Sequence, residues 1–139
     1  MQSTLIQPLA AGIVGYGYMG QIRRRNVDDH PDLALAGICD PVLKPGSDSL
    51  RARIFPSYQD LVDAPLDVLF VCTPNCVTPE VVIYGLEHGC HVFCEKPPGR
   101  NLSDIQRIIA AEKAHRELCL LYTSPSPRDR TRTRMPSSA

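Results

Sequence analysis

The sequence lacks a long hydrophobic run, an excess of one charge and any C-x-x-C pair. No apolar stretch approaches the length needed to cross a bilayer, and the N-terminal residues lack the charged start, apolar centre and cleavage site of a secretory signal. The formal net charge is zero, with 15 basic and 15 acidic side chains, so the balance indicates no nucleic-acid partner. With 139 residues, the chain has room for one domain. We therefore expect a cytoplasmic domain without nucleic-acid or membrane partners.

Six cysteines raise the alternatives of a metal site or disulfides. Their spacings include C-x-x-x-C twice, and four of them fall in or beside apolar, strand-like runs; they are Cys39, Cys72, Cys76, Cys90, Cys94 and Cys119. Zinc sites and redox motifs usually use closer pairs. We interpret the cysteines as reduced core residues and expect no metal site.

The most informative stretch is the glycine motif of residues 10–20. A short apolar run ends at Val14 and leads into G-x-G-x-x-G, formed by Gly15, Gly17 and Gly20. In a dinucleotide-binding turn the first glycine permits the tight turn, the second lets a pyrophosphate approach the backbone, and the third lets the next helix pack closely on the strand. The free N–H groups at the start of that helix then face the phosphates. An ordinary strand–turn–helix connection remains the alternative.

Asp40 is the second element of this pattern. It closes another apolar run, Leu33–Cys39, and lies twenty residues beyond Gly20. A carboxylate at the end of the second strand accepts hydrogen bonds from the adenosine ribose and repels a phosphate placed there. The pattern therefore favours NAD over NADP. The alternative is an Asp that forms a turn before Pro41.

Apolar segments and helical patterns alternate along the chain, which predicts an α/β fold with a doubly wound parallel sheet of the Rossmann type. The expected strands are 10–15, 33–39, 67–72 and 90–94, and the expected helices are 19–29, 47–53, 58–63, 77–88 and 103–116. We interpret Arg23, Arg24 and Arg25 as a solvated face of the first helix. Ligands of such folds bind outside the carboxyl ends of the strands, where the glycine motif, Asp40, Thr73–Asn75 and Glu95–Pro97 all lie.

These motifs resemble the N-terminal half of the glucose-fructose oxidoreductase / inositol dehydrogenase (Gfo/Idh/MocA) family. The resemblance covers about residues 10–118 and rests on Gly12–Gly20, Cys39–Pro41, Cys72–Asn75 and Cys94–Pro97. It implies an NAD(P)-dependent dehydrogenase in which the Thr73–Asn75 turn borders the nicotinamide half of the cofactor, and Glu95 and Lys96 flank the nicotinamide ribose. It further implies that Lys96 is catalytic and reaches the substrate oxygen, and that the Lys96–Pro97 bond is often cis. It also implies that the cofactor-binding residues are Gly15, Tyr16, Gly17, Tyr18, Met19, Gly20, Asp40, Thr73, Pro74, Asn75, Glu95 and Lys96.

The chain departs from the family pattern in two respects. Members commonly carry a His shortly after the Pro-Asn turn, where Thr78 stands here, and the second domain, which supplies most substrate contacts, is missing. We therefore expect a truncated fragment, inactive by itself, of an oxidoreductase that oxidises a sugar, cyclitol or sugar-nucleotide alcohol by hydride transfer to NAD. The resemblance also implies that the whole protein is a homo-oligomer. The alternatives are a non-catalytic NAD(P)-binding regulator and an enzyme that uses tightly bound NAD transiently, such as a glycosidase or epimerase.

The C-terminal residues differ abruptly in composition from the rest. From Cys119 the chain becomes rich in Pro, Ser, Thr and Arg, and its strings resemble translated sequencing-adapter DNA. We expect a leader over 1–9, a dinucleotide-binding domain over 10–118, and an artefactual, mostly disordered tail over 119–139. A genuine basic, phosphorylatable tail is the alternative. Leu118–Tyr122 is nonetheless apolar enough to fill the place of a further strand.

Overall fold

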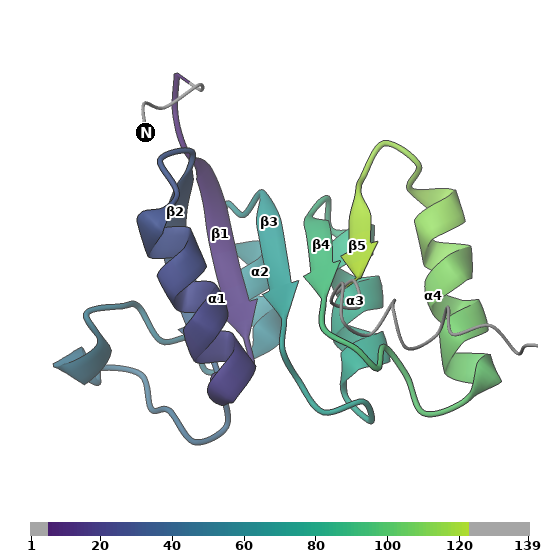
Figure 1. Cartoon of the computed structure of the whole chain (residues 1–139), viewed down its shortest axis with the longest axis horizontal. Coiled ribbons are helices and arrows are strands. Elements are labelled where there is room, and N and C mark those ends of the chain that lie inside the picture. Colours follow the sequence, from purple (N-terminus) through teal and green to yellow (C-terminus); the bar gives the residue numbers. More distant parts are fainter. Residues whose placement is uncertain (1–5, 123–139) are drawn as a thin grey trace, which may run out of the picture.

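Five parallel strands form a single sheet in the order β2-β1-β3-β4-β5 (Figure 1). The computed structural model describes residues 6–122, and the predicted tail lies largely outside this range. The strands are β1 (Leu9–Val14), β2 (Leu33–Cys39), β3 (Val68–Val71), β4 (His91–Cys94) and β5 (Leu120–Tyr122). After β2 the chain returns across β1, so that β3, β4 and β5 follow on the other side of β1, as the doubly wound prediction requires. β5 occupies the place expected for residues 118–122.

Helices connect the strands, and local sequence signals mark where two of them begin. The helices are α1 (Tyr18–Asp29), the 3-10 turn η1 (Asp48–Leu50), α2 (Tyr58–Asp63), α3 (Thr78–Glu87) and α4 (Leu102–Ala114). The Ser57 hydroxyl accepts a hydrogen bond from the Asp60 N–H at the start of α2, and the Asn101 side chain accepts one from the Asp104 N–H at the start of α4. Each cap satisfies a backbone donor that the helix leaves unpaired.

The sheet separates two hydrophobic layers. α1 lies over one face near β1 and β2, whereas α2, α3 and α4 cover the other face (Figure 1). Because successive side chains of a strand point to opposite faces, Ile13 packs with Ile38 and Ile54 on one side, whereas Val14 joins the larger core beneath α2–α4. Both faces of β1 are therefore buried, which explains its uninterrupted apolar sequence.

The predicted fold class is confirmed. The prediction of a helix over 47–53 is wrong, because only the short 3-10 turn η1 (Asp48–Leu50) forms there. The other strand and helix bounds differ from the prediction by only a few residues at their ends. The brief extended piece at Ile54 forms a single parallel bridge with Ile38 beside the edge strand β2. Within residues 6–122, no helix is both long enough and apolar enough to span a membrane. The fold therefore brings the carboxyl ends of its strands to one edge, where the predicted motifs lie.

Candidate functional site

The carboxyl ends of four neighbouring strands are in register. Val14 pairs with Cys39 on β2 and with Val71 on β3. Val71 pairs in turn with Cys94 on β4. The residues that directly follow these ends are Gly15, Asp40, Cys72 and Glu95. All four predicted motifs consequently start from one line across the sheet, as the sequence predicts.

The loop between β1 and α1 is shaped by two close backbone approaches. Gly15 has a φ of +89°, and a Cβ at this position would clash with the carbonyl oxygen of Cys72. A Cβ on Gly20 would clash with the carbonyl oxygen of Gly15. Only glycine fits both positions, so the predicted tight turn and the predicted close packing of α1 are both present.

Gly17 differs from these two glycines because it borders open space. A Cβ there would meet no atom within 4 Å. Gly17 is also the N-cap of α1, and it carries no side chain that could cap the helix. The first helical hydrogen bond runs from the Gln21 N–H to the Gly17 carbonyl oxygen over 3.0 Å. The N–H groups of Tyr18, Met19 and Gly20 precede this bond, so they have no acceptor within the helix and can serve an anion.

The Asp40 carboxylate joins the end of β2 to the glycine loop. Its Oδ2 accepts a hydrogen bond from the Tyr16 N–H at 2.7 Å, and its Oδ1 accepts one from the Val42 N–H at 2.8 Å. The second bond makes Asp40 a turn-forming residue, which was one of the two interpretations of the sequence. The first orients the carboxylate beside the glycine loop, which is compatible with the other interpretation. Its contact with a ribose stays a prediction.

The loop after β3 is held from inside by Thr78. Its hydroxyl oxygen lies 2.8 Å from the Thr73 hydroxyl, 3.1 Å from the Thr73 carbonyl oxygen and 3.0 Å from the Pro74 carbonyl oxygen. The Thr78 residue is only 1% exposed. At the place where the family commonly carries a His, this chain thus has a buried hydroxyl that holds the turn carrying Asn75. Asn75 itself is exposed.

The segment after β4 combines a buried carboxylate with an exposed ammonium. Glu95 is 8% exposed, whereas the neighbouring Lys96 is exposed to solvent. Arg23 Nε donates a hydrogen bond to Glu95 Oε1 over 2.5 Å. The peptide bond between Lys96 and Pro97 is cis, as the resemblance implies. The residues predicted to lie near the nicotinamide are therefore connected to α1.

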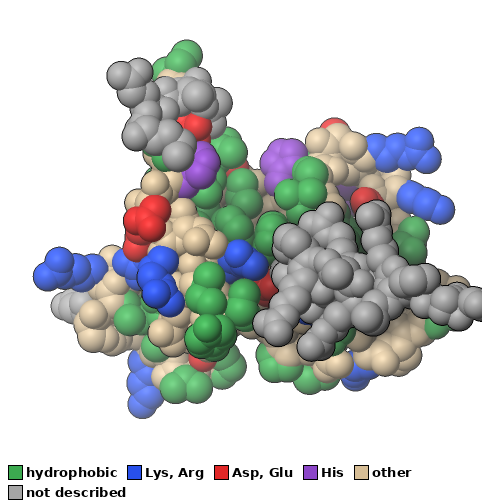
Figure 2. All heavy atoms as spheres, in the orientation of Figure 1, with side chains coloured by type: hydrophobic (Ala, Val, Ile, Leu, Met, Phe, Trp, Pro, Cys, Tyr) green, Lys and Arg blue, Asp and Glu red, His purple; other side chains and the backbone are tan. Residues whose placement is uncertain are grey.

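This pairing corrects the interpretation of the three arginines as a solvated face. Basic side chains do gather over α1 (Figure 2). The Arg23 side chain, however, is only 16% exposed and pairs with Glu95. The Arg24 side chain is 17% exposed and pairs with Asp28 on the same helix. Of the three arginines, only Arg25 is exposed as expected. The helical spacing of the sequence does indicate which arginines are partly buried. Arg23 and Arg24 lie one turn after Gly20 and one turn before Val27, so they share a helix face with these two buried residues.

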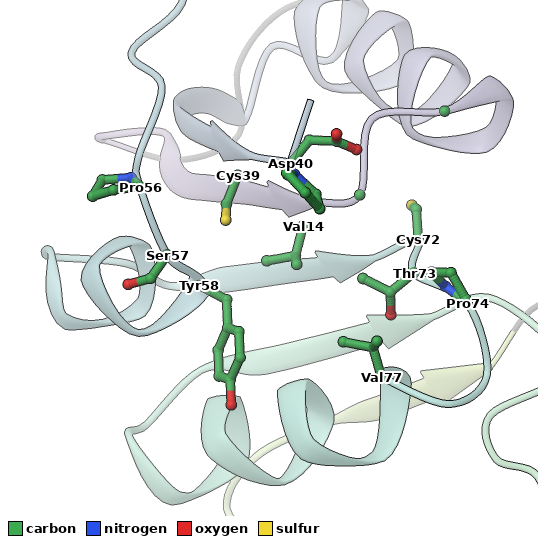
Figure 3. Close-up of a pocket in the computed structure, with 13 residues that line it drawn as sticks. Val14, Cys39, Asp40, Pro56, Ser57, Tyr58, Cys72, Thr73, Pro74 and Val77 are labelled. Carbon is green, nitrogen blue, oxygen red and sulfur yellow. The ribbon is translucent and has the colours of Figure 1, made fainter. Parts of the chain in front are cut away.

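A cavity of about 640 Å³ opens between the glycine loop and the start of α2. In Figure 3, Asp40 lies on one side of it, Thr73 and Val77 lie on another, and Val14 lies between them. Its lining residues are Val14, Gly15, Gly17, Cys39, Asp40, Pro41, Pro56, Ser57, Tyr58, Cys72, Thr73, Pro74 and Val77. The cavity thus unites the glycine loop, Asp40 and the loop after β3. Glu95 and Lys96 do not line it.

Several lining residues were not predicted from the sequence. Pro56, Ser57 and Tyr58 come from the connection after β2, and Val77 comes from the turn before α3. These positions belong to no motif, since their place is decided by the path of the connection. The apolar character of Ile54–Pro56 was the only local hint of a buried segment.

The cysteines divide into three groups by exposure, which partly corrects their prediction as core residues. Cys39, Cys90 and Cys94 are buried, but Cys76 and Cys119 are exposed. Cys72 lies in the cavity wall, where burial and then the nearby Glu95 carboxylate raise the pKa of its thiol to about 12. Within the described range, no three His, Cys, Asp or Glu side chains are grouped to hold a metal ion.

Comparison with known proteins agrees with this geometry. Residues 9–123 match the family model described as the oxidoreductase family with an NAD-binding Rossmann fold. The chain is 31% identical over 112 residues to the inositol 2-dehydrogenase of Salmonella typhimurium, which covers 76% of this chain and 33% of that protein. It is 34% identical over 97 residues to the D-glucoside 3-dehydrogenase of Escherichia coli K12, which covers 66% of this chain and 28% of that protein.

Solved structures show the same likeness. The scyllo-inositol dehydrogenase of Lactobacillus casei, solved with bound NAD(H) and scyllo-inositol, superposes with a TM-score of 0.76 at 25% identity. The alignment covers 84% of this chain and 36% of that one. The chain spans about a third of the length of the curated relatives it matches.

Proposed function

Because this chain belongs to the Gfo/Idh/MocA family of oxidoreductases with an NAD-binding Rossmann fold, we propose that it is the cofactor-binding part of an NAD-dependent dehydrogenase. The substrate class we propose is a sugar, cyclitol or sugar-nucleotide alcohol. The inositol and glucoside dehydrogenases among its relatives support this class. The activity belongs to the whole protein, since the matched part of this chain spans only about a third of the length of the relatives.

The observation that carries the proposal is the joint lining of one cavity by Gly15, Gly17, Asp40 and Thr73. These residues come from the ends of three adjacent strands, which is where doubly wound folds bind their ligands. The open space at Gly17 and the uncapped N–H groups of α1 suit a pyrophosphate. The apolar walls beside Asp40 suit an adenosine, with the carboxylate accepting hydrogen bonds from its ribose. The residues present therefore fit a dinucleotide.

Asp40 also supports NAD over NADP in this proposal. Both carboxylate oxygens already accept a backbone N–H, which holds the side chain in one orientation at the end of β2. A phosphate on the adenosine ribose would meet this negative charge and be repelled. The ribose hydroxyls of NAD would instead donate hydrogen bonds to it.

Lys96 is the residue to which we assign the chemical step. When bound, NAD supplies the acceptor for a hydride. The Lys96 ammonium donates a hydrogen bond to the alcohol oxygen of the substrate and stabilises the negative charge that develops there as the hydroxyl proton leaves to solvent; this charge is consumed when the hydride departs and the carbonyl forms. Its exposure at the end of β4 leaves it accessible to a substrate, while the adjacent Glu95 is buried and paired with Arg23. A Lys96 that only pairs with Glu95 or the ribose is the competing role.

The experiment uses the whole protein with NAD and a panel of polyols, including myo-inositol and scyllo-inositol, and follows cofactor reduction. Lys96→Met should lower turnover roughly a hundredfold and leave NAD affinity nearly unchanged. Lys113→Met, at an exposed position of α4, is the matched control. Unchanged turnover in Lys96→Met would remove this lysine from the mechanism. The 139-residue chain alone should reduce no cofactor, because one hydrogen bond from Lys96 would not orient a substrate.

The assembly is inferred from the family resemblance, and the compartment from the cysteines interpreted as reduced. We propose that the whole protein is a cytoplasmic homo-oligomer without a nucleic-acid partner. The zero net charge supports the last point. Light scattering of the whole protein measures its mass, and a monomer would contradict the expected assembly.

A further inference from the structure

Arg23 connects the two halves of the candidate site. It lies on α1, one turn after Gly20, whose backbone rests against Gly15 in the glycine loop. Its Nε donates to the Glu95 carboxylate, and Glu95 directly precedes Lys96. The helix that starts at the phosphate end of the site is thus joined by one side chain to the segment that starts its nicotinamide end.

The arginine is held on a second side by an aromatic ring. The guanidinium carbon of Arg23 lies 4.7 Å from the centre of the Phe93 ring on β4. Phe93 in turn contacts Phe70 on β3, with ring centres 5.6 Å apart. A planar guanidinium can stack on a ring and donate to a carboxylate at once, whereas a lysine offers only a point charge on a flexible stem. The direction of the Arg23–Glu95 bond is therefore well defined.

Glu95 has a strong need for a cation. It is 8% exposed, and burying a carboxylate is costly unless a cation and hydrogen-bond donors compensate its charge. Its backbone is already anchored, because the Glu95 N–H donates to the Val71 carbonyl oxygen at 3.0 Å. With the backbone held by β3, the remaining freedom lies in the Glu95 side chain and in the residues that follow it.

We infer that Arg23 is a positioning residue for the nicotinamide half of the site: it holds the Glu95 carboxylate, and with it the Lys96–Pro97 turn, in a set position relative to the glycine loop. This inference rests on the proposed function, since it presumes that NAD extends from the cavity toward Glu95. A purely structural ion pair between α1 and β4 is the competing role. The two roles differ in which part of the cofactor responds to a substitution.

Two ligands separate these roles, both titrated against the 139-residue chain by calorimetry. ADP ends at the pyrophosphate and reports the adenosine and phosphate contacts alone. NAD adds the second ribose and the nicotinamide. Arg23→Met removes the hydrogen bond to the Glu95 carboxylate, so the segment at the nicotinamide half of the site is no longer held in position. The variant should therefore weaken NAD binding about tenfold and change ADP binding less than about twofold. Arg25→Met, exposed on the same helix, is the matched control and should change neither affinity.

Further variants keep the inference falsifiable if Arg23→Met folds poorly, which thermal melting will reveal. Arg23→Lys retains the charge and should restore part of the NAD affinity. Glu95→Gln should weaken NAD binding as Arg23→Met does, and the double variant should lose no more than either single one, since both act through one contact.

The outcomes distinguish this inference from the proposed function. Equal loss of ADP and NAD affinity in the Arg23 variants, or no loss of either, would overturn the positioning role while leaving NAD binding intact. An unmodified chain that binds neither ligand would overturn the proposed function itself, and the inference with it. Additive losses in the double variant would show that Arg23 does not act through Glu95.

Discussion

Gly20 lies against the carbonyl oxygen of Gly15, at a separation that leaves no room for a Cβ. This contact lets α1 begin directly beside the end of β1, and it sets the direction in which the first N–H groups of the helix point. Gly17, between the two, is open on its outer side. The three glycines of the motif therefore differ: Gly15 and Gly20 are required by the backbone packing, whereas Gly17 leaves open the space that we propose for the pyrophosphate.

Alanine substitutions should separate these roles. Gly20→Ala should destabilise the fold, because the new methyl group must displace α1 from β1. Gly17→Ala should leave the melting temperature nearly unchanged, since its Cβ would meet nothing within 4 Å. It should nonetheless weaken NAD binding by about tenfold or more, as the methyl group would occupy the space proposed for the pyrophosphate. Melting curves and calorimetric titrations measure the two effects, and a Gly17→Ala variant with full NAD affinity would contradict the assignment.

Asp40 provides a test of cofactor preference. Asp40→Ala should weaken NAD binding roughly tenfold or more, since a hydrogen bond to a charged group is worth about 1.5–3 kcal/mol. It should also reduce the discrimination against NADP, because the repelling charge is gone. Asp29→Ala, exposed at the far end of α1, serves as control. Calorimetric titration with NAD and with NADP measures both affinities for each variant. Tighter binding of NADP than of NAD by the unmodified chain would refute the preference.

Thr78 should matter more for its hydroxyl than for its size. Thr78→Val keeps the shape but removes the group that lies within 3.1 Å of three oxygen atoms of Thr73 and Pro74. We expect a loss of about 1–3 kcal/mol in the free energy of unfolding, together with weaker NAD binding. Thr78→Ser retains the hydroxyl and should lose less of both. Chemical denaturation compares the two variants, and equal stability of the Val and Ser proteins would argue against the hydrogen-bonded role.

Alkaline pH should weaken the fold through its buried thiols. Burial, followed by the Glu95 carboxylate, raises the pKa of Cys94 to about 12. In the unfolded chain a thiol loses its proton above a pH of about 8.5, so between these values the folded state binds more protons than the unfolded state. The free energy of unfolding should therefore fall as the pH rises from about 9 toward 12. In Cys94→Ala the free energy of unfolding should fall less steeply with pH. Chemical denaturation at a series of pH values measures this, and an equal fall in both proteins would contradict a contribution from the Cys94 thiol.

Much of the site was predictable because it depends on local sequence. Continuous apolar runs predicted the buried strands, and the helices predicted to begin at 58 and 103 start beside Ser57 and Asn101, whose side chains cap α2 and α4. The pairing of Arg23 was not predictable in this way. A run of three arginines does not reveal which one meets a carboxylate seventy-two residues away, because that depends on how α1 lies across the sheet. The same holds for Tyr58, which reaches the cavity only through the path of the connection after β2.

The central claim is that NAD binds at the carboxyl edge of this sheet, and nuclear magnetic resonance of the isotope-labelled chain tests it most directly. Titration with NAD should shift the amide signals of Gly15–Gly20, Asp40 and Thr73 in a saturable way. The amides of Leu33, Asp67 and Gly89, at the opposite edge, should stay in place. Saturable shifts confined to the opposite edge, or no saturable shift at all, would contradict the account.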